Sequence, residues 1–93
     1  MIQVNEYYEG AVKSMAADNK EGKFTVGVME AGEYEFGTAT IEIMTVVAGE
    51  MKVQLPGETE WKVYKPFESY RIEKDKSFKL IIEETCSYRC QYL

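Results

Sequence analysis

Turn-forming residues interrupt this chain at intervals of eight to twelve residues, which leaves room only for short elements. We expect turns at residues 18–22, 30–33, 48–50, 55–58, 65–66 and 74–77. The runs between them are rich in Val, Ile, Thr, Tyr and Phe, which are residue types that favour strands. This spacing and composition predict an all-β sandwich or barrel.

Eight strands are expected, at residues 23–29, 33–38, 41–49, 50–55, 60–65, 68–73, 77–84 and 86–93. Only residues 9–20 have a composition compatible with a helix, and Gly10 and the pair Asp18 and Asn19 limit that helix to a turn or two. The sequence shows no repeat, no low-complexity segment and no linker. Residues 1–93 are therefore expected to form a single domain.

Composition narrows the classes of function. A net charge of −5 argues against a nucleic-acid binder, which needs a basic surface to replace phosphate counterions. No apolar run approaches the roughly 20 residues that span a bilayer, and residues 1–20 do not resemble a signal peptide. We expect a cytoplasmic protein with neither a membrane nor a nucleic-acid partner. A hydrophobic content of 45% in so short a chain favours a homodimer.

Two cysteines, Cys86 and Cys90, lie near the C-terminus. On one strand they are about 13 Å apart, which is too far for a disulfide. The chain has no histidine and no third cysteine to complete a zinc site. Both are expected to be reduced side chains packed in the core.

Glu42 is the first candidate for chemistry. Side chains alternate between the two faces of a strand, so an inward Glu42 brings Met44 and Val46 inward as well. The alternation leaves open the opposite choice, in which Ile41 and Ile43 are the inward pair and Glu42 is a surface residue. A buried carboxylate needs polar partners, and the hydroxyl groups available are those of Thr38, Tyr34, Tyr70 and Tyr88.

The flanking strands follow the same alternation. On the preceding strand the set matching Glu42 is Tyr34, Phe36 and Thr38. On the last strand the choice lies between Arg89 with Gln91 and the more apolar set of Tyr88, Cys90 and Tyr92. The apolar set is expected to face the interior.

Arg71 and Arg89 are the only arginines, and a guanidinium group matches the geometry of phosphate. The alternative for each is an exposed strand face, paired with a glutamate. Aromatic side chains in strands mostly pack in a core or a dimer interface, and this is the first expectation for the tyrosines and Trp61. The alternative is that some of these rings stack on a heterocycle.

The chain resembles the small cupin-like pyrimidine/purine nucleoside phosphorylases of bacteria over almost its whole length. The segments that carry the resemblance are NEYYEGAVKS (5–14), VGVMEAGEYEFGT (26–38), EIMTVVAG (42–49), VQLPG (53–57) with Trp61 and Tyr64, Phe78, and YRCQYL (88–93). This chain has Phe67 where the family usually has glycine, Glu73 where it usually has proline, and Ile41 where a proline commonly precedes the glutamate.

The resemblance implies a cupin-like β-barrel of the jelly-roll type, usually a homodimer. It implies that nucleosides of purines and pyrimidines are split by phosphate into free base and pentose 1-phosphate. Glu42 stands seven residues before Gly49, where cupins usually place a metal-ligand glutamate, yet no histidine accompanies it. The reaction is therefore expected to need neither a metal nor any other cofactor.

By this resemblance, Glu42 stabilises the positive charge that develops at the anomeric carbon, and Tyr88 donates to the departing base. Arg89 or Arg71 is expected to hold phosphate. The substrate-binding residues are expected to be Tyr34, Phe36, Thr38, Met44 and Tyr70. The alternatives are a non-catalytic cupin module that binds a small polar metabolite and a purely structural dimer domain.

Overall fold

Ten short strands and a single turn of 3-10 helix follow one another along residues 1–93, all of which the computed structural model describes. The elements are β1 (Gln3–Tyr7), η1 (Tyr8–Gly10), β2 (Val12–Asn19), β3 (Gly22–Met29), β4 (Gly32–Gly37), β5 (Glu42–Ala48), β6 (Met51–Gln54), β7 (Lys62–Tyr64), β8 (Ser69–Ile72), β9 (Ser77–Ile82) and β10 (Cys86–Tyr92). The all-β prediction is confirmed. The structure contains no helix with the length and apolar character that crossing a membrane would require.

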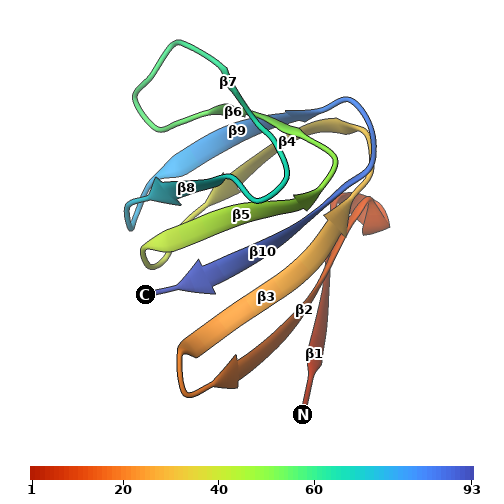
Figure 1. Cartoon of the computed structure of the whole chain (residues 1–93), viewed down its shortest axis with the longest axis vertical. Coiled ribbons are helices and arrows are strands. Elements are labelled where there is room, and N and C mark those ends of the chain that lie inside the picture. The colour runs from red at the N-terminus through yellow and green to blue at the C-terminus, as the bar shows by residue number, and fades with distance from the viewer.

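The strands form two antiparallel sheets that face each other (Figure 1). The larger sheet has the order β1-β2-β3-β10-β5-β8, and the smaller has the order β4-β9-β6-β7. Neighbours in each sheet are mostly distant in sequence, because strands cross from one sheet to the other as in a Greek key. The part formed by β1, β2 and β3 extends beyond the smaller sheet, at the lower end of Figure 1.

The core lies between the two sheets and is built by alternation along each strand. Val46, Met51 and Val53 are completely buried, and each has exposed or half-buried neighbours on its own strand. The remaining members of this cluster are Val12, Met29, Tyr34, Met44, Tyr70, Ile72, Phe78, Leu80, Ile82, Cys86, Tyr88 and Cys90. Both cysteines are free and buried, as the sequence predicts.

The two N-terminal strands, β1 and β2, were not expected from the sequence. Residues 12–19 form β2 rather than any helix, and β1 precedes it. Val12, Ser14 and Ala16 are buried while Lys13 and Met15 are exposed, which is the period of two of a strand. Pairing with β3 along the whole of β2 therefore outweighs the helix-compatible composition.

Phe67 adopts a left-handed backbone conformation, with φ of 71°, in the turn between β7 and β8. This conformation costs a residue with a Cβ atom about 1–2 kcal/mol relative to glycine. The Phe67 ring contributes little in return, because the residue is 81% exposed. Phe67 therefore stands at a position whose geometry favours glycine.

We expect Phe67→Gly to raise the free energy of unfolding by about 1 kcal/mol, after allowing for the greater freedom of glycine in the unfolded chain. Urea denaturation of both proteins measures this difference. Phe67→Ala is the matched control, because it removes the ring but keeps the Cβ atom. Equal stabilisation by Ala and Gly would show that the ring, and not the backbone, is responsible.

Candidate active site

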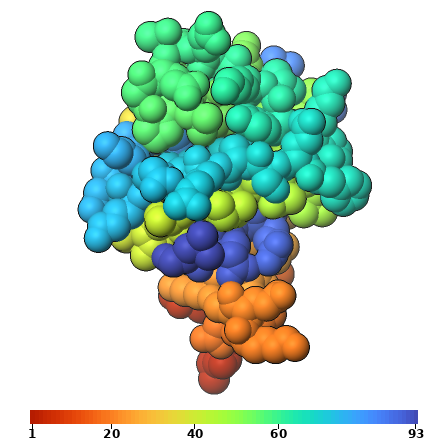
Figure 2. Space-filling model, turned by 60° about the vertical axis from the view of Figure 1, so that its left-hand side comes forward, coloured from red at the N-terminus to blue at the C-terminus, as the bar shows by residue number.

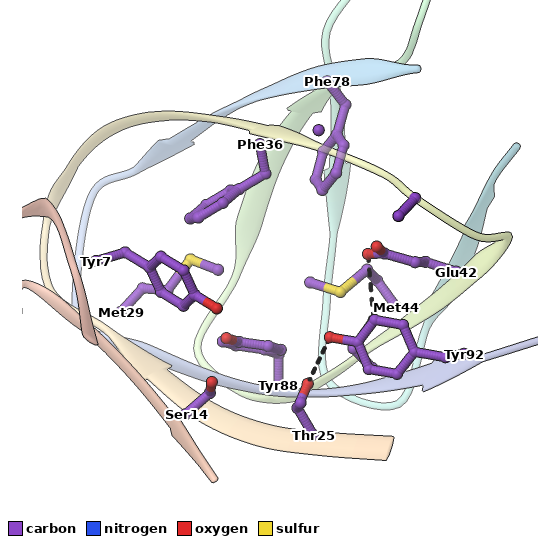
Figure 3. Close-up of a pocket in the computed structure, with 13 residues that line it drawn as sticks. Tyr7, Ser14, Thr25, Met29, Phe36, Glu42, Met44, Phe78, Tyr88 and Tyr92 are labelled. Atoms are coloured by element: carbon purple, nitrogen blue, oxygen red, sulfur yellow. Dashed lines mark hydrogen bonds between the residues drawn. The ribbon is translucent and has the colours of Figure 1, made fainter. Parts of the chain in front are cut away.

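A cavity of about 250 Å³ lies between the two sheets, beside β1, β2 and β3 (Figure 3). This volume is slightly below the usual range of ligand sites, which begins at about 300 Å³. The lining residues are Tyr7, Ser14, Thr25, Met29, Phe36, Gly37, Ala39, Glu42, Met44, Phe78, Tyr88, Cys90 and Tyr92. They include one carboxyl group, several hydroxyl groups and one thiol, but no basic side chain.

Glu42 supplies the carboxyl group of the pocket. It is the first residue of β5 and is paired with Tyr92 of β10 and Ile72 of β8. The thiol of Cys90 donates a hydrogen bond to Glu42 Oε1, with a distance of 3.4 Å between sulfur and oxygen. Burial raises the pKa of the Glu42 carboxyl, and the bond from Cys90 acts in the opposite direction. The charged form of this carboxylate is therefore poorly solvated when the pocket is empty.

Tyr88 of β10 is paired with Gly27 of the neighbouring strand β3, and its ring lies across the backbone of this glycine. A Cβ atom at Gly27 would stand 2.6 Å from both Cζ and the hydroxyl oxygen of Tyr88, so only glycine leaves room for the ring. Burial raises the pKa of Tyr88 to about 12, while a hydrogen bond with Ser14 acts to lower it. Tyr88 therefore keeps its proton at neutral pH.

Tyr92 and Thr25 form the hydroxyl pair at the end of the pocket near the C-terminus (Figure 3). Their hydroxyl oxygens are 3.3 Å apart, and either can donate to the other. Burial raises the pKa of Tyr92, so this hydroxyl also remains protonated. The pair presents two neutral groups that can each donate or accept a hydrogen bond.

An aromatic wall closes the other end of the pocket. Tyr7 meets Phe36 edge to face, with 5.9 Å between ring centroids. Tyr7 is followed by the turn of η1, where Tyr8 and Glu9 adopt left-handed conformations. The Tyr8 hydroxyl donates to the carbonyl of Glu35 at 2.8 Å and accepts from its amide at 2.9 Å. These two hydrogen bonds to the backbone of β4, an edge strand, fix the turn. They thereby hold Tyr7 against the pocket.

The structure brings several of the predicted site residues together. Glu42, Tyr88, Phe36 and Met44 all line the pocket. The inward sets expected on β5 and β10 are observed: Met44, Val46, Tyr88 and Cys90 are buried, and Glu42 faces the same side. The open choice at Glu42 is thus settled in favour of the inward orientation.

Three other predicted site residues lie outside the pocket lining, with their hydroxyl groups already bonded within the protein. Tyr34 donates to the carbonyl of Glu30 at 2.7 Å, and the Tyr70 hydroxyl lies 3.5 Å from the sulfur of Met51. Thr38 donates to the carbonyl of Glu73 at 2.7 Å. All three are buried and serve packing or loop structure in this conformation.

The structure does not bring either arginine to the pocket. Arg89 follows Tyr88 on β10 and so points to the opposite face of the sheet, where it is exposed and donates to Gln91 Oε1 at 2.6 Å. Arg71 follows the buried Tyr70 on β8 in the same way. Its Nε forms an exposed ion pair with Glu73 Oε2, also at 2.6 Å. The alternative reading, an exposed strand face with glutamate nearby, describes Arg71.

Sequence reasoning missed Tyr7, Ser14 and Thr25 as pocket residues. Tyr7 and Ser14 belong to β1 and β2, which were not expected as strands. The alternation of Val12, Ser14 and Ala16 with Lys13 and Met15 was the available signal. Thr25 lies on a predicted strand, but nothing in the sequence indicated which face of that strand meets the pocket.

Residues 2–92 match the family described as pyrimidine/purine nucleoside phosphorylase. The chain belongs to the pyrimidine/purine nucleoside phosphorylase family. It is 47% identical to a family member from Pseudomonas aeruginosa strain LESB58 over 92 residues, which cover 99% of each protein. A family member from Pseudomonas syringae pv. tomato is 45% identical over the same length and the same share of both chains.

Solved structures of other proteins have the same architecture as this chain. A protein of unknown function from Vibrio parahaemolyticus is 41% identical, with a TM-score of 0.96 over 100% of this chain and 99% of that chain. An RmlC-like cupin from Shewanella frigidimarina has a TM-score of 0.77 at 17% identity, covering 98% of this chain and 82% of its own. The predicted cupin-like fold is therefore confirmed.

Proposed function

We propose that this protein cleaves purine and pyrimidine nucleosides with inorganic phosphate, releasing free base and pentose 1-phosphate. The observation that carries the proposal is the half-buried carboxyl group of Glu42, held in the pocket of a member of this family. Neutral hydroxyl groups surround it and suit a pentose.

The reaction exchanges one bond at the anomeric carbon for another. The bond from this carbon to the base nitrogen breaks, and its electron pair leaves with the base. A phosphate oxygen then forms the new bond at the same carbon. Positive charge builds up on the pentose between these events, and the carboxylate of Glu42 stabilises it. This stabilisation is strong because the pocket solvates the carboxylate poorly.

The departing base gains a proton or a hydrogen bond as it accepts the electron pair. Tyr88 is our candidate hydrogen-bond donor to the base, because its phenol faces the pocket and burial raises its pKa to about 12, which keeps it protonated at neutral pH. The aromatic wall of Tyr7 and Phe36 offers the base a surface that stacks without reading its hydrogen-bonding edge. Such a surface would tolerate both purines and pyrimidines.

We propose that the reaction needs no metal. The chain has no histidine, and no group of three or more Cys, Asp or Glu side chains is placed to hold a metal ion. The side chain of Glu42 points into the pocket and supplies its only carboxyl group. Its role is therefore to act directly on the substrate.

Incubation of the purified protein with uridine or adenosine, with and without phosphate, tests the proposed function. Free base should appear only when phosphate is present, and EDTA should leave the rate unchanged. A thermal shift with nucleosides but no release of base would instead indicate a non-catalytic binding module. Loss of activity with EDTA, restored by a metal, would contradict metal independence.

We also propose that the protein acts as a homodimer. Val4, Met15 and Val26 occupy one row on the outer face of the larger sheet and are 62%, 52% and 41% exposed. Val28 adds a further exposed apolar group on β3. A second copy would cover this face. Sedimentation equilibrium tests the proposal. The wild-type protein should be a dimer, and Val26→Lys should yield monomers. A monomeric wild-type protein would contradict the proposal.

A further inference from the structure

The pocket lacks a lining cation, although the proposed function requires it to bind an anion. Phosphate carries one to two negative charges near neutral pH. The only carboxyl group in the pocket is that of Glu42, which repels an anion when it is charged. An attractive charge must therefore come from the rim of the pocket or from outside it.

Lys23 is placed at that rim by the register of the larger sheet. On β3, Thr25 and Met29 face the pocket, and Lys23 lies two residues before Thr25 on the same face. The ladder between β3 and β10 ends with Phe24 opposite Gln91, so the next residues on the two strands are Lys23 and Tyr92. Tyr92 in turn is paired with Glu42 on β5.

The contacts around Lys23 bear out this placement. Its ammonium nitrogen lies 5.6 Å from the centroid of the Tyr92 ring, a cation–π geometry. The side chain of Gln91 donates to the carbonyl of Lys23 at 3.0 Å and holds the two strand ends together. Figure 2 shows the start of β3, in orange, directly against the C-terminal residues, in dark blue.

Lys23 is also free to bind an anion. The three ion pairs of the structure involve Lys13, Lys62 and Arg71, so no carboxylate neutralises the ammonium group of Lys23. Asp18 is in register with Lys23 on β2, yet no ion pair joins them. Lys23 is exposed, which lets its flexible side chain turn toward a ligand in the mouth of the pocket.

Resting on the proposed function, we propose that Lys23 and the hydroxyl groups of Thr25 and Tyr92 form the phosphate-binding end of the pocket. The ammonium group supplies the charge, and the two hydroxyls supply hydrogen bonds at a point where they are already 3.3 Å apart. A phosphate held there lies on the Tyr92 side of Glu42. The pentose then lies against Glu42, and the base extends toward the aromatic wall of Tyr7 and Phe36.

Steady-state kinetics of Lys23→Gln test this assignment. We expect the KM for phosphate to rise about tenfold, which corresponds to the loss of about 1.4 kcal/mol of binding, while the KM for uridine changes less than twofold. Lys23→Arg should retain most of the phosphate affinity. Lys20→Gln is the matched control. Lys20 is an exposed lysine in the turn before β3, and its substitution removes the same charge. That control should leave both KM values unchanged.

Phosphate binding measured without nucleoside separates this inference from the proposed function. Titration of inorganic phosphate followed by 31P NMR should show weaker binding to Lys23→Gln than to Lys20→Gln, even if no nucleoside is cleaved. Equal phosphate affinity of the two variants would overturn the assignment. A parallel rise in the KM for uridine would overturn it as well, because it would indicate a general disturbance of the pocket.

Discussion

Glu42→Gln should lower kcat/KM for nucleoside phosphorolysis by about 10²- to 10³-fold, the usual loss when one group that stabilises charge in the transition state is removed. Gln keeps the size of the side chain and can still accept the hydrogen bond from Cys90. It cannot carry the negative charge that balances the developing positive charge on the pentose. The loss should therefore appear mainly in kcat, as measured by release of base at saturating substrate.

The same substitution should make the protein more stable at neutral pH. Burial raises the pKa of Glu42 in the folded state, so the folded protein binds this proton more tightly than the unfolded chain does. The free energy of unfolding therefore falls as pH rises from the ordinary pKa of glutamate through the raised folded pKa. Glu42→Gln removes this ionisation. Denaturation should show a gain in stability above that window and none below it.

A matched control is Glu50→Gln, which removes the same charge from an exposed residue. It should leave kcat at the wild-type value. Wild-type activity in Glu42→Gln would refute the role proposed for this carboxylate. Loss of activity together with loss of stability at neutral pH would indicate structural damage instead.

The strands between β3 and β10 could be predicted because their turns carry Gly, Pro, Asp and Lys at regular spacing, and their bounds differ from the predicted ones by at most two residues. The N-terminal strands could not. Residues 9–20 have a helix-compatible composition, yet the hydrogen bonds between residues 12–19 and β3 make this segment a strand. Non-local pairing of this kind leaves little trace in local sequence.

The pocket shows the same division between local and non-local information. Alternation along β5 and β10 correctly placed Met44, Tyr88 and Cys90 inside. The arginines were chosen for their chemistry, whereas the alternation that buries Tyr88 necessarily turns Arg89 outward. Lys23 was overlooked because its position depends on where the ladder between β3 and β10 ends. Strand register, rather than residue type, decides which cation can approach the pocket.

Gly27→Ala should cost both stability and activity. The added Cβ atom would lie 2.6 Å from the ring of Tyr88 and 2.8 Å from the backbone oxygen of Lys13. Rotation of one side chain cannot relieve both contacts, because the second is with the backbone of a paired strand. We expect a loss of about 3 kcal/mol, at the upper end of the range for overpacked cores, and a fall in melting temperature of roughly 12–24 °C.

Gly37→Ala is the control for this substitution, because its nearest neighbour is the Lys76 carbonyl oxygen at an ordinary distance of 3.8 Å. Its melting temperature should stay close to that of the wild type. Where Gly27→Ala remains folded, its kcat should fall, because the ring of Tyr88 must leave the surface that aims its hydroxyl into the pocket. Unchanged melting temperature and kcat would show that β3 and β10 can separate without cost, and that the position of Tyr88 does not depend on the bare backbone beneath it.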